Sequence, residues 1–386
     1  MTGTAGPAIA VAMANPQPLR RGWTTGACAT AAAKAAYAAL LTGAFPDPVE
    51  ITLPGGQNVA FALAETAQTS ESASAGVVKD AGDDPDVTHG ALVRATVRRS
   101  PPGAGVSFRA GLGVGVVTRR GLPLPPGEPA INPVPRQMIT VALAEVAARA
   151  GVAADAVVEI SIPDGEALAQ RTLNPRLGIV GGLSILGTTG VVIPYSCSAW
   201  IHGIRNGIDV ARAAGLDHVA GATGRTSEAA VQTRYDLPEI ALIDMGDFVG
   251  GMLKHLRAHP IPRVSIAGGV AKITKLAQGR LDLHSKRGSA DLAALAHLAE
   301  AADAEAGLGR RIAGANTVAE AFEAARDHGF ALGEVVAAGA RAVAVEVLRG
   351  AETDIEVLIY DRQGALVAQA GFAAGHAGVS DRNRRA

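Results

Sequence analysis

Residues 218–277 read HVAGATGRTSEAAVQTRYDLPEIALIDMGDFVGGMLKHLRAHPIPRVSIAGGVAKITKLA. Short apolar runs alternate here with longer amphipathic runs. The pattern predicts strands at 218–222, 240–244 and 264–267, and helices at 227–234, 247–258 and 269–277. Strand–helix alternation at this spacing is typical of a mainly parallel sheet with helices on its faces.

The chain on either side of this stretch has a different pattern. A helix is expected at 202–214, mostly helical structure from 291 to about 349, and a hairpin from 357–360 and 366–369. In the first half, Thr24 or Thr25 can cap an alanine-rich helix over 26–41, with Gly43 as its stop. The remaining runs predict a hairpin from 49–53 and 59–63, a helix at 136–150, and short strands near 77–78, 92–97, 114–118 and 157–162.

These elements predict a mixed α/β and α+β fold with two domains. We expect a disordered tail over residues 1–18, an α+β domain with an acidic loop over 19–150, and an α/β domain over 151–386. The second domain would hold a glycine-rich loop and a helical C-terminal part. Six prolines in 123–135 predict a linker.

Composition excludes several classes of protein. The 386 residues include 35 Lys and Arg against 36 Asp and Glu, so no overall charge favours nucleic acid or an anionic membrane. Cys28 and Cys197 lie far apart, which argues against a disulfide framework or a cysteine-based metal site and predicts a soluble, cytoplasmic protein.

The uncharged stretch 177–204 is long enough for a membrane span, but its glycines, prolines and hydroxyls predict buried strands and loops instead. No basic residue precedes the short apolar run 8–14, so we expect no signal peptide there.

The most charged motif is KDAGDDPDVTHG at 79–90. Its four carboxylates repel one another, so a cation, protonation or solvent must balance them. Either the motif is a solvated loop, or it is a site for a cationic group or a general base, because crowding raises a carboxyl pKa toward neutrality. Candidate catalytic residues are Asp83, Asp84 and His89.

A second motif, NPRLGIVGGLSILGTTG at 174–190, is rich in glycine. It matches neither common nucleotide-binding pattern, so its glycines are either packing positions or part of a ligand loop. Exposed amides and two hydroxyls would suit the polar parts of a nucleoside. The candidate ligand contacts are Gly181, Gly182, Gly187, Thr188, Thr189 and Gly190.

Two predicted turns carry basic residues at the same edge of the parallel sheet. They are ATGRTSE at 222–228 and SIAGGVAKITK at 265–275. Helix N-termini bind anions, and open α/β sheets bind ligands at this edge. Either turn taken alone could equally be an ordinary solvent-exposed connection between a strand and a helix. Two such turns side by side favour a ligand with several acidic groups. Cys28 is expected to be a buried apolar residue, and Cys197 has no identifiable catalytic partner in the sequence. His202 and His284 are single histidines, which are more often structural than catalytic.

The ordered set of motifs resembles the CbiD family, the cobalt-precorrin-5B C(1)-methyltransferases of the oxygen-independent route to cobalamin. The resemblance is carried by RGWTTGACA at 21–29, the loop at 80–90, GEPAINPVPR at 127–136, TLNPR at 172–176, the stretch 177–190, TGR at 223–225 and LHSK at 283–286. Two positions depart from the family pattern: Ala27 replaces the usual Thr, and residues 193–200 (IPYSCSAW) replace an acidic segment.

The resemblance implies methyl transfer from S-adenosylmethionine to a ring carbon of a cobalt-bearing tetrapyrrole. Cobalt would belong to the substrate, and the protein would need no metal of its own. Basic side chains would pair with the substrate's acetate and propionate groups, and holding two ligands in line would supply most of the acceleration. The implied substrate contacts are Thr24, Thr25, Arg136, Arg176, Arg225, Lys272, Lys275, His284 and Lys286. Neighbouring enzymes of the cobalamin pathway are conceivable partners. A non-catalytic corrinoid carrier and a dinucleotide-dependent oxidoreductase are the alternatives.

Overall fold

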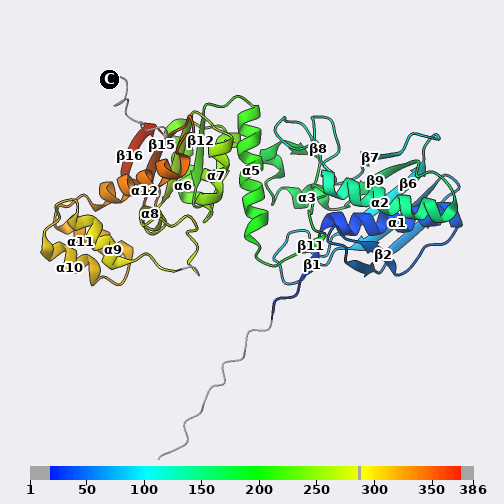
Figure 1. Cartoon of the computed structure of the whole chain (residues 1–386), viewed down its shortest axis with the longest axis horizontal. Helices are drawn as coiled ribbons and strands as arrows, with labels where there is room; N and C mark the ends of the chain where they lie inside the picture. The colour runs from blue at the N-terminus through cyan, green and yellow to red at the C-terminus, as the bar shows by residue number, and fades with distance from the viewer. Residues whose placement is uncertain (1–17, 286–287, 375–386) are drawn as a thin grey trace, which may run out of the picture.

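The computed structural model describes residues 18–285 and 288–374, which form two lobes side by side with helix α5 standing between them (Figure 1). Each lobe is built around one five-stranded sheet. The mixed fold class expected from the sequence is confirmed. No helix in the described part of the chain is long and apolar enough to cross a membrane.

The sheet of the N-terminal lobe has the order β4-β5-β6-β9-β7 and is antiparallel except between β7 and β9. Its strands are β4 (Glu65–Gln68), β5 (Ser72–Val78), β6 (Leu92–Arg99), β7 (Val106–Ala110) and β9 (Ala156–Ser161). Because β9 belongs to this sheet, the first lobe continues past residue 150. The expected boundary at 150/151 is therefore corrected: the chain enters the second lobe at α5 (Cys197–Ala213).

Helix α1 (Thr25–Thr42) covers this sheet, and α2 (Pro133–Ala150) packs against α1. The Thr24 hydroxyl caps α1 by accepting from the Ala27 amide, and Gly43 ends it at φ 80°. Fifteen of the residues of α1 are buried, and most are alanine, because the helix lies between the sheet, α2 and a hairpin where larger side chains would not fit. The predicted cap, helix and stop are confirmed.

Short strand pairs lie outside the two large sheets, and two of these pairs join segments far apart in the sequence. The pairs are β1 (Gly22–Trp23) with β11 (Val191–Val192), β8 (Val116–Val117) with β10 (Ile179–Val180), and the predicted hairpin β2 (Val49–Thr52) with β3 (Asn58–Phe61). Short helices α3 (Gly165–Ala169) and α4 (Asn174–Leu177) lie nearby in the chain. The proline-rich segment 123–135 is no linker, because Ala130 and Ile131 are fully buried and Ile131 bridges to Ile185.

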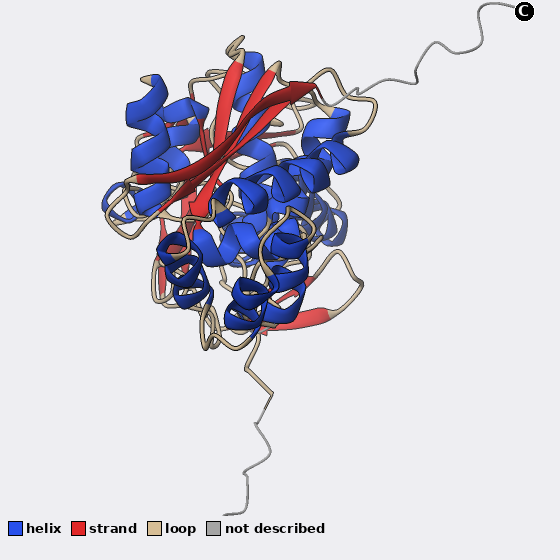
Figure 2. Cartoon of the chain, turned by 90° about the vertical axis from the view of Figure 1, so that its left-hand side faces the viewer, coloured by secondary structure: helices blue, strands red, loops and turns tan. Residues whose placement is uncertain are grey.

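The sheet of the C-terminal lobe has the order β13-β12-β14-β15-β16. This lobe faces the viewer in Figure 2, with strands in red and helices in blue. Its strands are β12 (His218–Ala222), β13 (Leu242–Asp244), β14 (Arg263–Gly269), β15 (Asp354–Tyr360) and β16 (Leu366–Ala374). The first four in this order are parallel and β16 is antiparallel, as the sequence predicts. From β12 the chain continues to β13 on one side, and from β14 it continues to β15 on the other side. The neighbours β12 and β14 therefore form the switch point at which open α/β sheets bind ligands.

Helices cover both faces of this second sheet. They are α6 (Arg225–Tyr235) on one face, and α7 (Val249–Ala258), α8 (Val270–Ala277) and α12 (Leu332–Leu348) on the other. A 3-10 turn, η1 (Glu239–Ala241), precedes β13. The helices α9 (Leu292–Glu300), α10 (Ala306–Ala313) and α11 (Val318–Asp327) form the far end of the lobe (Figure 1). Because α5 begins at Cys197, the stretch 177–204 is not all strand and loop. The expected tail, except Pro18, lies outside the described residues.

Candidate functional site

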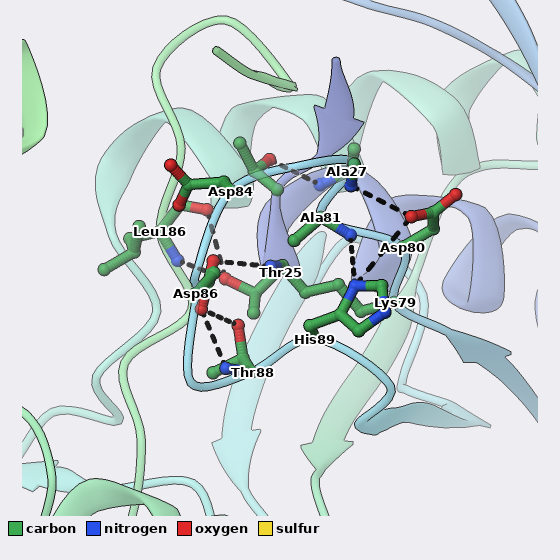
Figure 3. A network of polar contacts seen from close by, with 12 residues as sticks. Thr25, Ala27, Lys79, Asp80, Ala81, Asp84, Asp86, Thr88, His89 and Leu186 are labelled. Atoms are coloured by element: carbon green, nitrogen blue, oxygen red, sulfur yellow. Dashed lines mark hydrogen bonds and ion pairs between the residues drawn. The ribbon is translucent and has the colours of Figure 1, made fainter. Parts of the chain in front are cut away.

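The acidic loop connects β5 to β6 and is organised around the buried Lys79 (Figure 3). Lys79 is 1% exposed, and its ammonium lies 2.6 Å from a carboxylate oxygen of Asp86. The other oxygen of Asp86 accepts from the amide and hydroxyl of Thr88 at 2.8 and 2.6 Å. Burial alone would raise the pKa of Asp86, but the Lys79 charge and these hydrogen bonds outweigh it and lower the pKa.

The first carboxylate of the loop, Asp80, is paired with Arg20. Hydrogen bonds from Arg20 and then from the Gly82 amide lower the pKa of Asp80 to about 2. His89 lies 3.9 Å from Asp80, and its Nδ1 accepts from the Ala81 amide at 3.1 Å. This contact places the proton of a neutral His89 ring on Nε2, so the half-exposed ring presents a donor to a ligand. His89 can accept a proton only if Nδ1 releases the Ala81 amide.

The remaining two carboxylates bind backbone amides. Asp83 accepts from the Arg20 amide at 2.6 Å, and Asp84 accepts from the Tyr195 amide at 2.8 Å. The chain's own donors therefore balance all four carboxylates. For Asp80 and Asp86 the expectation that crowding raises the pKa is wrong, because ion pairs and hydrogen bonds lower it. Asp84 connects the acidic loop to segment 193–200, the one that departs from the family pattern.

The turn at 186–190 packs on the N-terminus of α1. The Thr25 hydroxyl donates to the Leu186 carbonyl at 3.2 Å and accepts from its amide at 3.0 Å (Figure 3), and the Thr24 amide donates to Gly190 at 3.0 Å. Thr24 and Thr25 thus hold the start of α1 and this turn in one place. Thr188 and Thr189, between the contacts, are exposed.

Gly187 and Gly190 have packing reasons to be glycine. Gly187 has φ 130°, and a Cβ there would lie 2.3 Å from the Thr24 hydroxyl; Gly190 has φ 81°, and its Cβ would meet Leu53 at 2.6 Å. Any larger residue would displace the start of α1 or the β2–β3 hairpin. Valine at either position would therefore disturb the fold as well as any ligand contact.

The other predicted glycines lie apart from this turn. Gly182 packs against Gly113, whose carbonyl would lie 2.1 Å from an added Cβ, and its own carbonyl accepts from Asn174 at 3.1 Å. Gly181 precedes Gly182, and the buried residues 182–185 separate it from the turn at 186–190. The glycine-rich stretch is therefore two features, and only the turn at 186–190 packs against the start of α1.

The two basic turns meet at the C-terminal edge of the second sheet, as predicted. The Thr223 amide donates to Ala267 at 3.0 Å, so the turn after β12 lies against the end of β14. Arg225, the first residue of α6, is exposed, and its guanidinium has no ion pair within residues 18–285 and 288–374. It is the predicted substrate contact best placed to pair with an external anion.

Most of the other predicted substrate contacts already have partners within the chain. Arg136 binds Glu128 at 2.8 Å, and Arg176 binds Glu228 of α6 at 2.9 Å. Lys272 pairs with Asp247, and the buried Lys275 donates to the Leu283 carbonyl at 3.0 Å. These side chains hold loops and lobes together. His284 follows Leu283 and donates its amide to Asp282 at 3.1 Å, and Lys286 lies outside the described residues.

One acidic residue that the sequence analysis does not single out lies at the same sheet edge. Asp244 ends β13, and its carbonyl accepts from the Trp200 indole at 2.9 Å. Burial and then repulsion from Glu228 raise the pKa of the Asp244 carboxyl, against the lowering effects of Arg176 and Arg225. A carboxyl with a raised pKa at this edge of the sheet, one strand away from the switch point, is suited to accept a proton. The sequence signal that could have identified Asp244 is an aspartate at the end of a predicted parallel strand.

Asp244→Asn is expected to stabilise the protein at neutral pH. Because folding raises the pKa of Asp244, the folded protein favours the protonated carboxyl over the carboxylate. The stability that this group contributes is therefore fully present below about pH 4, the pKa of an unfolded carboxyl. It is lost as the pH rises through the pKa of the folded state. Asparagine keeps the shape and removes the charge. Denaturant midpoints should differ at pH 7 and converge near pH 4; a deficit of the variant at both pH values would contradict the assignment.

The two cysteines differ in their surroundings. Cys28 is fully buried in α1, and burial raises the pKa of its thiol to about 12, so it is a packing residue as expected. Cys197, at the first turn of α5, is partly exposed.

Comparison with known proteins matches this two-lobed α/β protein to one family. Residues 12–194 match the CbiD family model, and residues 282–371 match that of the CbiD C-terminal domain. The chain is 62% identical over 371 residues to a cobalt-precorrin-5B C(1)-methyltransferase of Agrobacterium fabrum, covering 95% of this chain and 98% of the relative. The protein of the same name from Halorhodospira halophila is 61% identical over 355 residues, covering 92% and 95%. The chain belongs to the CbiD family. A crystal structure of the cobalamin biosynthesis protein CbiD from Archaeoglobus fulgidus matches with 25% identity and a TM-score of 0.36, over 81% of this chain and 85% of that one.

Proposed function

We propose that this protein methylates C-1 of cobalt-precorrin-5B, with S-adenosylmethionine as the methyl donor, to give cobalt-precorrin-6A in cobalamin biosynthesis. The observation that carries the proposal is the identity of about 60% to methyltransferases of that name along nearly their whole length. The proposal places the protein in the cytoplasm, the compartment that its two unpaired cysteines favour.

The reaction needs alignment and one proton acceptor. The ring carbon attacks the methyl carbon, the new C–C bond forms as the S–CH3 bond breaks, and the sulfonium leaves as neutral S-adenosylhomocysteine. The electron pair for attack is released when the substrate gives up a proton. Asp84 is our first choice to receive it, with Asp83 and His89 as alternatives on the same loop, because Asp84 reaches the segment that connects the two lobes.

Segment 186–200 offers a surface for the substrate's flat ring. Four large apolar side chains are exposed along it, between the acidic loop and the end of β13: Leu186, Ile193, Tyr195 and Trp200. Large apolar side chains that are exposed along one segment are suited to bind a flat apolar ring. The ring would lie on this segment, with carboxylate arms reaching Arg225 at the sheet edge.

Arg225→Ala is expected to weaken corrinoid binding about tenfold to a hundredfold, because a charge-assisted hydrogen bond to a carboxylate is lost. The loss should shrink as salt screens the charge, and donor binding should not change. Arg263→Ala is the matched control, since Arg263 lies at the opposite edge of the same sheet in an exposed pair with Asp217. Equal substrate affinity of the two variants in titration calorimetry would contradict this placement.

The turn at 187–190 is proposed to contact the methyl donor, and the geometry directs the test to Thr188 rather than to its glycines. The Thr189 hydroxyl is used within the turn, where it bonds the backbone of Val191 at 3.2 Å. Thr188→Val keeps the side-chain volume and removes a hydroxyl, so donor affinity should fall about threefold to tenfold. Thr140→Val, on the exposed face of α2, is the control. Unchanged donor affinity for Thr188→Val would show that the turn serves packing.

A further inference from the structure

Three side chains of types that commonly bind metals converge near the C-terminal ends of α5 and α7. Nε2 of His255 lies 2.8 Å and Nδ1 of His259 lies 4.0 Å from the same oxygen of Asp209. All three donor atoms lie within 4.8 Å of one another. His255 and His259 are four residues apart at the end of α7, so they share one face of the helix, and Asp209 projects from α5.

We propose that Asp209, His255 and His259 bind one divalent transition-metal ion of the Zn²⁺ class. Two imidazoles and a carboxylate are the donor set that suits zinc and its first-row neighbours, rather than Mg²⁺ or Ca²⁺. Ligand atoms about 2.0–2.2 Å from a tetrahedral ion lie roughly 3.4 Å from one another. The observed separations bracket that value, so small side-chain rotations would complete the site.

The backbone and the rings already hold the two histidines for this role. The His259 amide donates to the His255 carbonyl at 2.8 Å, and the imidazole rings stack with centroids 4.3 Å apart. Pro260 follows and ends the helix there. The ligands are partly buried, with side-chain exposures of 13% for His255, 30% for Asp209 and 43% for His259.

The cluster opens to solvent through a hollow of about 630 Å³ that Asp209 and His259 line together with Arg212 and Asp217. Water or a small anion can therefore reach the open coordination position of an ion with three protein ligands. Arg212 offers a positive group beside that position, although its Nε donates to the Pro260 carbonyl at 3.1 Å.

This site is separate from the proposed methyl-transfer site. The rings of Trp200 and Phe248 meet at 6.3 Å near the start of α5 and α7, so the two helices run in the same direction. Asp209 lies nine residues beyond Trp200, or about 13 Å along the helix. The ion would fasten the far ends of the two helices. The cysteine spacings and the family resemblance predict no protein-bound metal, and neither takes account of ligands shared between two helices.

The test is metal titration of the full chain after treatment with a chelator. Calorimetry with Zn²⁺ should find one site with a dissociation constant on the order of micromolar or tighter. With Co²⁺, visible absorption of a nitrogen–oxygen site should rise to one equivalent, without the intense near-ultraviolet bands of thiolate ligands. His259→Ala, a change at a half-exposed position, should weaken binding at least tenfold, and His255→Ala should do the same.

The matched control is His297→Ala, which removes an exposed histidine paired with Glu300 at 3.3 Å on α9. It should leave affinity and stoichiometry unchanged. Circular dichroism of each variant separates loss of ligand from loss of fold, and His259→Ala keeps the test valid if His255→Ala unfolds. No binding to the parent chain, or binding unchanged in His259→Ala, would overturn the proposal; either result would leave the methyl-transfer proposal standing.

Discussion

Replacing Asp86 by Ala is expected to destabilise the N-terminal lobe by about 3–5 kcal/mol, because it leaves the buried Lys79 ammonium without its counter-charge. Lys79 is 1% exposed and bonds Asp86 at 2.6 Å. The lowered pKa of Asp86 means that its stability contribution is present above the unfolded carboxyl pKa, about 4, and is lost as pH falls through the folded value. The measurement is the free energy of unfolding in denaturant at pH 7, repeated at lower pH.

Asp80→Asn is the matched control in the same loop. Asp80 pairs with Arg20, but both side chains are largely exposed, so this change should cost less than about 1 kcal/mol. Adding Lys79→Met to Asp86→Ala should recover much of the loss, since no unpaired charge is left buried. A cost for Asp86→Ala no larger than that for Asp80→Asn would show that Lys79 reaches water in solution.

Asp84→Asn is expected to cut methyl transfer about a hundredfold to ten-thousandfold, the usual effect of losing a positioned acid–base group. The asparagine oxygen can still accept from the Tyr195 amide, so the loop keeps its connection to segment 193–200. Both ligands should therefore bind as before. Single-turnover rates measured beside binding constants separate a chemical defect from a structural one.

Asp83→Asn and His89→Ala complete the comparison. Asp83 bonds the Arg20 amide and His89 bonds the Ala81 amide, so each is held in the same loop without the link to Tyr195. A large loss of the methyl-transfer rate in only one of these two variants would identify that residue as the proton acceptor. Near-normal rates in all three variants would make the loop a structural feature stabilised by its own donors, and Asp244 would then be the carboxyl to test.

Local pattern was sufficient to predict the parallel strands of the second sheet and the first helix of the N-terminal lobe, but not β4 and β7 of the first sheet. The strands of 218–277 and the capped helix after Thr24 were predictable, because alternation, capping residues and glycine stops act over a few residues. The position of β9 was not, since pairing with β6 and β7 depends on contacts far apart in sequence. The proline-rich segment 123–135 likewise has the composition of a linker but is held by Ile131.

The candidate site was predictable as a set of segments but not as a set of interactions. Sequence identifies Arg136, Arg176 and Lys272 as cations, whereas only the fold shows that Glu128, Glu228 and Asp247 neutralise them. In the same way, four crowded aspartates suggest an unmet need for positive charge. Lys79, Arg20 and two backbone amides meet that need from positions that spacing alone does not reveal.

The most direct test of the account is a single incubation of the protein with cobalt-precorrin-5B and S-adenosylmethionine carrying a ¹³C-labelled methyl group. We predict that the label appears on one ring carbon, C-1, with one S-adenosylhomocysteine formed for each product molecule, as ¹³C NMR and mass spectrometry would show. Bound tetrapyrrole recovered without label would indicate a carrier, and a change in mass only when a dinucleotide is supplied would indicate an oxidoreductase; either result would contradict the account.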